Sequence, residues 1–545
     1  MIKVSQQFKE AVYNQNKRRT TAKVSFEILD NEAYNDNTST VTSEATISRK
    51  SQLTNKKRNM SYKYATFERD YFKLDGSFRI PPKRDEGNSE LGWWSGDICD
   101  SEGIFNPYQV LEFNFTEKHN SMGLTITFDT MTNEYASDFD IEVYNADNNL
   151  IHLEQVTNNK NPSYVLVKGL DEYKKIKITI KKWIKPYRRS RIVEVDFGVL
   201  HEYEDDKLIK VDIIEQMNII SDTIPSNEIK FTIDNSSKEF NILNPSGFYR
   251  FLKERQEVKA AIGVEVSEDE FEYIPMGKFY LIDWQSDEGA LTTTFIARDI
   301  FELLEQKEYT SITNTNLYDL AKDILIKSNV ENYHIDEELK KISTSGFKEK
   351  LNSRKALQYI GIAGRSAIYQ DRQGVLQIKQ FKTLDERDTQ YIYFAGPDIF
   401  TGMIYPMVDE GYDMKNITFD NVYNEPQIKL DKLIYSLTMV IHDGTEEKQE
   451  FTFHNEGIKE GSSFKIDNPL INTIELAEDV AKWIISEYNL RALYNINWRQ
   501  NPALECGDIV LVEDSFNAKK QSRIIKQEFE YQGYLSGKTE TKGGV

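Results

Sequence analysis

The order of strand and helix patterns along the chain constrains its fold more than any other feature. Apolar residues at helical spacing are concentrated in residues 313–380, and one further helix is predicted over about residues 473–490. Apart from that helix, residues 208–305 and 391–545 show short strand patterns separated by turns. With 545 residues the chain is too long for one core, which favours three to five domains. We therefore expect a mainly β protein with a smaller α+β part.

The helical segment is predicted to be a small α+β domain. Leu317, Leu320 and Ile324 lie on one face of a first helix. Ser353 is predicted to cap a second helix. A hairpin over residues 367–378 follows and completes the domain.

Residues 108–197 predict a separate all-β unit. Strand patterns follow one another at short intervals in this segment, with turn residues between them. They cover residues 110–115, 123–128, 139–144, 150–156, 163–168, 175–180 and 192–197. Several short strands at this spacing favour a sandwich or jelly roll.

The last fifty residues predict three consecutive strands. A turn over residues 501–508 leads into an apolar strand at 509–512, and a second strand follows at 523–531. A turn at Gly533 then leads into a final polar strand. None of these residues is suited to catalysis, so the block is interpreted as architectural, with Cys506 as a small buried residue in the strand-entry turn.

Charge argues against a surface that binds nucleic acid. The formal net charge is -20, from 88 acidic and 68 basic residues, whereas nucleic-acid binding needs a basic stripe. An acidic surface is compatible with a channel wall along which DNA slides without sticking, because like charges repel. It is equally compatible with an ordinary soluble acidic protein.

The distribution of cysteine and histidine predicts neither a metal nor a cofactor. Cys99 and Cys506 are far apart in sequence and are expected to be free thiols. The six histidines are scattered singly, without a second ligand at metal-binding spacing. No apolar run approaches the length of a membrane span, and the first residues do not resemble a signal peptide.

The order of these units resembles that of the baseplate hub proteins of tailed phages and of phage-derived contractile particles. The blocks that carry the resemblance are residues 24–28, 231–235, 240–245, 277–281, 354–360, 371–376 and the C-terminal block. The resemblance covers nearly the whole chain and rests on the order of the blocks. One departure is a segment of roughly 65–200, which contains residues 73–78 and 92–95 and is similar to galactose-binding-like carbohydrate modules.

The resemblance implies two tube-protein-like β-barrel domains, an inserted β-sandwich and a small helix–hairpin domain. The first barrel would begin in residues 1–64 and continue in 201–310, interrupted by the sandwich at 65–200. The α+β domain would cover 311–388 and the second barrel 389–545.

The same resemblance implies a structural function. Three subunits would form an adaptor between the sixfold tail tube and the threefold spike, and would line the distal channel. The implied partners are tube or tube-initiator proteins, a spike or tip protein, the tape measure and other baseplate proteins. The implied location is the virion tail, after synthesis in the cytoplasm of the host bacterium.

Two other functions are weighed against this one. A carbohydrate-binding attachment protein would use the inserted segment. A cell-wall hydrolase is less favoured, because the chain has no Gly-x-Ser-x-Gly motif and no pair of carboxylates that stands out as catalytic. Asp138, Asp140 and Glu142 share a strand face, which is the ordinary pattern of a solvated strand. We expect no catalytic residue.

Trp93 and Trp94 are the residues most open to a binding function. Exposed indoles stack on sugar rings, and Trp183 with Tyr187 forms a second candidate of this kind. The alternative is that the indoles pack inside the sandwich, since tryptophan brings a large apolar surface. For Trp183 and Tyr187 the alternative is a solvated basic loop or a subunit contact.

Overall fold

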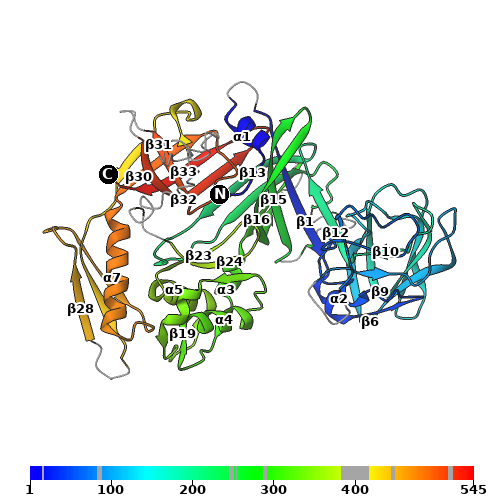
Figure 1. Cartoon of the computed structure of the whole chain (residues 1–545), viewed down its shortest axis with the longest axis horizontal. Coiled ribbons are helices and arrows are strands. Elements are labelled where there is room, and N and C mark those ends of the chain that lie inside the picture. The colour runs from blue at the N-terminus through cyan, green and yellow to red at the C-terminus, as the bar shows by residue number, and fades with distance from the viewer. Residues whose placement is uncertain are drawn as a thin grey trace, which may run out of the picture. The chain divides into compact units, whose positions relative to one another are not determined.

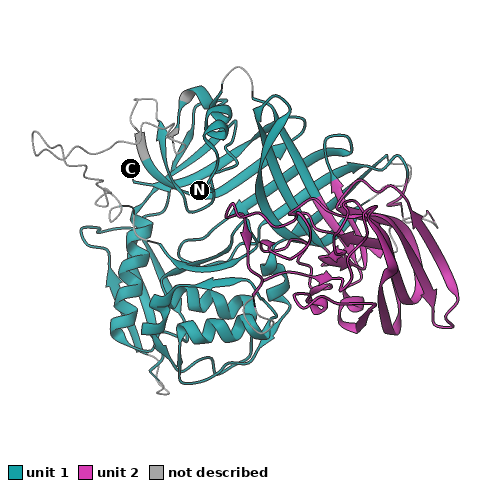
Figure 2. Ribbon diagram, turned by 45° about the vertical axis from the view of Figure 1, so that its right-hand side comes forward, with its two compact units in different colours: residues 1–24, 203–237, 257–545 teal, residues 25–202, 238–256 magenta. Residues whose placement is uncertain are grey.

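A computed structural model describes residues 1–14, 18–82, 89–241, 244, 251–252, 255–285, 291–381, 384, 416–443, 449–513 and 519–544. The chain divides into two compact units, shown in different colours in Figure 2. Unit 1 comprises Met1–Val24, Tyr203–Ser237 and Glu257–Val545, and unit 2 comprises Ser25–Glu202 and Lys238–Gln256. The five predicted segments divide the chain more finely than these two units and remain a prediction. In the described part of the chain, no helix is both long and apolar enough to cross a membrane.

Unit 2 is built around a six-stranded sheet with the order β11-β6-β9-β7-β8, to which β2 adds beside β6. The strands are β2 (Asn37–Val41), β6 (Ile104–Thr127), β7 (Ala136–Asn145), β8 (Leu150–Val156), β9 (Ser163–Trp183) and β11 (Glu194–Asp196). Two-stranded pairs are β3 (Lys63–Tyr64) with β4 (Phe78–Arg79), and β5 (Trp93–Trp94) with β10 (Arg191–Ile192). All seven predicted strands overlap strands of the structure, but the first two are continuous in β6, the fifth and sixth are continuous in β9, and the seventh is divided between β10 and β11. The core of unit 2 includes Phe113, Ile126, Phe139 and Ile178.

Unit 1 contains the same strand order twice. The first set, called here the first repeat, is β1 (Thr20–Leu29, of which residues 20–24 belong to unit 1), β13 (Leu208–Gln216), β14 (Glu228–Asp234), β15 (Glu257–Ser267), β16 (Glu270–Gln285) and β17 (Thr292–Arg298). The second repeat is β25 (Asn416–Ile417), β26 (Gln427–Leu430), β30 (Ala492–Trp498), β31 (Ile509–Glu513), β32 (Lys519–Tyr531) and β33 (Leu535–Gly543). Their orders in the sheet are β1-β15-β16-β17-β14-β13 and β25-β31-β32-β33-β30-β26. Counted along the chain, both orders read one, four, five, six, three, two.

The two repeats are joined into one sheet through β13 and β32, which are labelled in Figure 1. The predicted strands of residues 208–305 and of the C-terminal block are all present in this sheet. The mainly β fold class is therefore confirmed. Of the block at residues 240–245 that carries part of the resemblance, residues 242, 243 and 245 lie outside the described residues.

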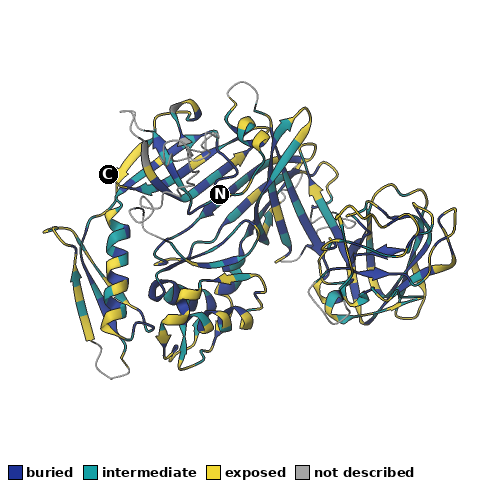
Figure 3. Ribbon diagram, in the orientation of Figure 1, coloured by how far each residue is buried: buried dark blue, intermediate teal, exposed yellow. Residues whose placement is uncertain are grey.

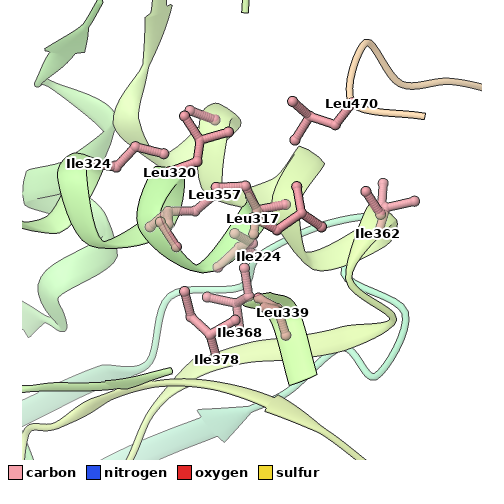
Figure 4. Packing of buried hydrophobic residues seen from close by; sticks show 14 of the residues in the cluster. Ile224, Leu317, Leu320, Ile324, Leu339, Leu357, Ile362, Ile368, Ile378 and Leu470 are labelled. Carbon is pink, nitrogen blue, oxygen red and sulfur yellow. The ribbon is translucent and has the colours of Figure 1, made fainter. Parts of the chain in front are cut away.

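The helices of unit 1 pack around a second core. They are α3 (Ile300–Glu305), α4 (Leu317–Lys327), α5 (Ser353–Ala363) and α7 (Ile474–Asn489), and α1 (Gln6–Tyr13) contacts β15 instead. Figure 4 shows Leu320 and Leu357 on the helices of this core and, below them, Ile368 from the hairpin of β23 (Ser366–Gln370) and β24 (Leu376–Gln380). Figure 3 shows both buried and exposed residues along α7, as expected of a helix that covers a core with one face. A three-stranded sheet of β28 (Gln449–His454), β27 (Ile434–Ile441) and β29 (Ser462–Asp467) contributes Leu437 and Met439 to it.

Candidate assembly site

The junction between the two repeats is an antiparallel pairing of β13 with β32. It runs from Val211 opposite Tyr531 to Gln216 opposite Lys526, without a break in register. Directly before this stretch, β32 has a bulge against β33, where the register skips Ile525. The earlier part of β32 pairs with β31 instead. On the side away from β33, β32 therefore changes its partner from β31 to β13 at the bulge, and in this way connects the two repeats.

A buried ion pair stabilises this junction. The Arg372 guanidinium donates from Nη2 to Glu215 Oε2 at 2.7 Å, and Gln527 Nε2 donates to the same oxygen at 3.1 Å. Arg372 Nη2 also donates to the Leu504 carbonyl at 2.6 Å, and its other terminal nitrogen donates to the Pro502 carbonyl. Each charge thus has several partners, as a buried pair requires. The network links β13, the turn after β23 and the turn before β31.

The Cys506 thiol next to this network is unreactive. Burial raises the pKa of the Cys506 thiol well above its ordinary value, and the nearby Glu215 carboxylate adds to the effect. The thiol therefore stays protonated and is a poor nucleophile. Burial also raises the pKa of Glu505. Cys506 lies buried in the strand-entry turn, as the sequence indicates.

A second buried ion pair connects α7 to β32. Arg523 Nη1 donates to both oxygens of Glu487 at 3.3 Å. Beside it lies a pocket of about 370 Å³, which is also lined by Asp431 and Lys542. Lys542 Nζ donates to Asp431 Oδ2 at 2.9 Å. The pocket wall thus contains two ion pairs, Arg523 with Glu487 and Lys542 with Asp431.

The described residues contain no group of three or more His, Cys, Asp or Glu side chains that could hold a metal ion. Asp140 and Glu142, which share a strand face in unit 2, are bound by lysines. Lys181 Nζ lies 2.6 Å from Asp140 Oδ2, and Lys177 Nζ lies 2.7 Å from Glu142 Oε2. Asp138 accepts a hydrogen bond from the Asn158 backbone at 2.8 Å.

The three tryptophans proposed from sequence as glycan contacts lie inside unit 2. Trp93 and Trp94 are 0% exposed and Trp183 is 1% exposed. Their indole nitrogens donate inward, from Trp93 to the Ser43 carbonyl at 3.0 Å and from Trp94 to the Leu91 carbonyl at 3.0 Å. Buried indoles present no face to a sugar ring. A glycan-binding surface on this unit would therefore need other side chains.

Trp94 stacks against a buried arginine. The Arg191 guanidinium carbon lies 4.3 Å from the centre of the Trp94 ring. Arg191 donates to Glu68 at 2.6 Å, to Glu134 at 3.1 Å and to Asp129 at 3.2 Å. Burial alone would lower the pKa of Arg191, but the negative groups around it raise that pKa above its ordinary value. This cluster anchors β5 and β10 to the rest of the unit.

Tyr187 is the one sequence-predicted candidate that is not fully buried. It is partly exposed and has a left-handed backbone conformation, with φ of 57°. The Arg69 guanidinium carbon lies 4.9 Å from the centre of its ring. The structure does not bring Tyr187 together with an exposed indole among the three candidates.

Comparison with known proteins found no matching family model and no matching curated protein. Solved structures do match. A tail protein from Neisseria meningitidis MC58 is 11% identical over 64% of this chain and 94% of its own, with a TM-score of 0.42. The 43 kDa tail protein of prophage MuSo2 from Shewanella oneidensis is 12% identical over 63% of this chain and 94% of its own, with a TM-score of 0.39.

A third solved structure is a component of the type VI secretion system from E. coli, described as structurally similar to the T4 bacteriophage tail proteins gp27 and gp5. It is 10% identical over 62% of this chain and 74% of its own, with a TM-score of 0.35. All three are described either as tail proteins or as structurally similar to tail proteins.

Sequence reasoning did not identify Glu215 or Arg372. Arg372 falls in one of the blocks that carry the resemblance, but no motif marks it as half of an ion pair. The two residues are 157 positions apart, so only the fold brings them together. The one local signal is that Glu215 follows the apolar alternation of β13 at a position that the fold buries.

Proposed function

We propose that this chain is the structural baseplate hub of a phage tail or a phage tail-like particle. Three copies form an adaptor between the sixfold tail tube and the threefold spike, and line the distal channel. The role is mechanical and involves no catalysis. The partners are tube or tube-initiator proteins, a spike or tip protein, the tape measure and other baseplate proteins, in the virion tail.

The observation that carries this proposal is the repeated strand order in unit 1. Two sets of six strands share one order in the sheet, so that three chains supply six sets. A threefold assembly of such chains can present a near-sixfold surface on one side. A protein with one set per chain could not match both symmetries with three copies.

Two further observations support the proposal. The net charge of -20 suits a channel wall that must let DNA pass, because like charges limit adhesion. Arg372 and Glu215 form a buried ion pair at the junction, which favours a structural role over a reactive one. Attachment through a glycan, the alternative function, would have to use Tyr187 or other exposed residues of unit 2.

The mass of the purified chain tests this proposal. Light scattering after size-exclusion chromatography should give the mass of three chains, alone or after addition of the tube and spike proteins. Electron micrographs of that species should show a ring with six lobes around a central hole. A chain that stays monomeric with all of these partners present would contradict the proposed function.

A further inference from the structure

The junction inside the chain has a counterpart that the chain leaves open. In the shared order, β26 occupies the place of β13, and β16 occupies the place of β32. Inside the chain, β13 of the first repeat pairs with β32 of the second. The equivalent junction would pair β26 of the second repeat with β16 of a first repeat. This chain does not make that pairing among its described residues.

A matching bulge aligns β16 with β32 residue by residue. The register between β16 and β17 skips Ile282, and the register between β32 and β33 skips Ile525. Ile282 is thus equivalent to Ile525. Trp284 then corresponds to Gln527, which lies two residues beyond the bulge in β32.

The register of the neighbouring strands aligns β26 with β13 in the same way. The pairings of β33 with β30 and of β17 with β14 make Tyr494 equivalent to Ile229. Tyr494 lies opposite Ile428, and Ile229 lies opposite Ile213. Two residues further along each strand, Leu430 therefore corresponds to Glu215.

Among the described residues, neither strand has a partner on the side that this junction would use. All four residues of β26 are exposed, with Ile428 at 56% and Leu430 at 53%. Among the described residues, β26 pairs only with β30. After its bulge, β16 pairs with β17 on one side, and its pairing with β15 ends at Tyr280. Exposed apolar edge strands of this kind are templates for pairing with another chain.

We propose that β26 of one copy pairs antiparallel with residues 283–285 of β16 in a second copy, in the register of the β13–β32 junction. This inference rests on the proposed function and specifies how its subunits meet. In that register Leu430 lies opposite Trp284, and Lys429 lies opposite Gln285. The partner is a second copy of this chain.

In this register Asp283 lies opposite Asp431, whose carboxylate is bound by Lys542 at 2.9 Å, and the next pair of side chains is complementary. At the junction inside the chain, the equivalent residues are Glu215 and Gln527, which are buried and hydrogen-bonded at 3.1 Å. Between copies, the same places hold Leu430 and Trp284, an apolar pair in which the leucine is exposed and the indole is partly exposed in the single chain. Pairing would remove both from water, which favours association.

The geometry makes the contact head-to-tail. Each copy offers β26 from its second repeat and β16 from its first repeat, so that the two contacting surfaces differ. Contacts of this type form a ring if the rotation closes. If each new junction repeats the rotation of the junction inside the chain, three copies close a ring with three internal and three intersubunit junctions.

Paired cysteine substitutions test the contact in the full chain. The double variant Leu430→Cys with Trp284→Cys should form a disulfide between copies under mild oxidation, because opposite residues of antiparallel strands lie within disulfide reach. Gels without reductant should then show bands up to three chains and none above. Each single variant should stay a monomer band, whereas a mixture of the two should give a dimer band. The native cysteines are both buried.

A second pair of cysteine substitutions leaves Trp284 in place, so that a folding defect of the Trp284→Cys variant does not decide the result. Lys429→Cys with Gln285→Cys uses two exposed positions in the same register. Its cross-linked fraction should exceed that of the mismatched pair Lys429→Cys with Glu270→Cys by on the order of tenfold. Glu270 is exposed at the opposite end of β16.

The outcomes separate this inference from the proposed function. A species with the mass of three chains in which neither matched pair cross-links would overturn the contact and leave the trimer intact. Cross-linking of Leu430→Cys alone would mean that two β26 strands meet, and would also overturn it. A monomer in the presence of tube and spike proteins would contradict the proposed function itself.

Discussion

Glu194 is a carboxyl group that the fold holds in its neutral form. Burial raises its pKa to about 9, and the neighbouring Asp196 carboxylate adds to the effect. Backbone amides of Lys56 and Asn55 donate to its two oxygens at 2.8 and 3.3 Å and oppose that shift. Asp196 itself stays paired with Arg58 at 2.9 Å. Unit 2 thus contains a group whose ionisation favours the unfolded chain.

The residue-scale prediction follows from this pKa. The unfolded chain releases the Glu194 proton near pH 4.5, whereas the folded chain keeps it up to about pH 9. Rising pH therefore weakens folding between these values, by at most about 1.4 kcal/mol per pH unit. Glu194→Gln removes the titration. The melting temperature of the native protein minus that of the variant should fall as pH rises from about 5 to about 9.

Differential scanning calorimetry at several pH values measures this difference. Glu102→Gln, at an exposed carboxyl group of the same unit, is the matched control and should leave a nearly constant difference. A Glu194→Gln difference that is equally constant with pH would contradict the neutral state of Glu194.

At the scale of elements, the helix starts show how closely local sequence rules hold. Asp299, a typical capping residue, caps α3, and its side chain accepts a hydrogen bond from the Phe301 amide. For α5 the predicted cap was Ser353, but the structure uses Asn352, whose side chain accepts from the Lys355 amide at 2.7 Å. Ser353 instead lies buried and donates to the Lys307 carbonyl at 3.2 Å. The two residues are both good caps, and packing of the serine decided between them.

The element-scale prediction is that Asn352→Ala destabilises unit 1 by about 1 kcal/mol, the typical cost of losing an N-cap. Asn352→Asp, which keeps an acceptor for the Lys355 amide, should cost much less. Chemical denaturation of both variants measures the difference. Equal stability of the alanine and aspartate variants would show that the side chain of Asn352 does not cap α5.

At the scale of the whole molecule, each compact unit has a core of its own. Phe113 belongs to the core of unit 2, and Leu357 belongs to a core of unit 1. Because the buried surfaces are separate, we expect two transitions on thermal unfolding. Phe113→Ala should lower one transition and Leu357→Ala the other, each by a loss of about 2 to 5 kcal/mol. Calorimetry measures both transitions, and a substitution that lowers both equally would contradict independent cores.

The local sequence alone predicted most of the elements. Period-two alternation identified the strands of the C-terminal block, and helical spacing identified α4 and α7, because these patterns depend on neighbours within a few residues. The candidate site was less accessible to such reasoning. The tryptophans were recognisable as important, but nothing in the local sequence says whether an indole faces water or a core.

The tertiary structure alone decided which strands meet. The order of six strands occurs twice in unit 1, and it became visible only in the pairing of the strands. Strand pairing depends on backbone groups and on surfaces brought together over hundreds of residues, as between Glu215 and Gln527. The sequence by itself therefore determined a mainly β chain around one α+β segment. Only the fold decided that β13 and β32 form a junction, and that among the described residues β26 and β16 do not form the equivalent one.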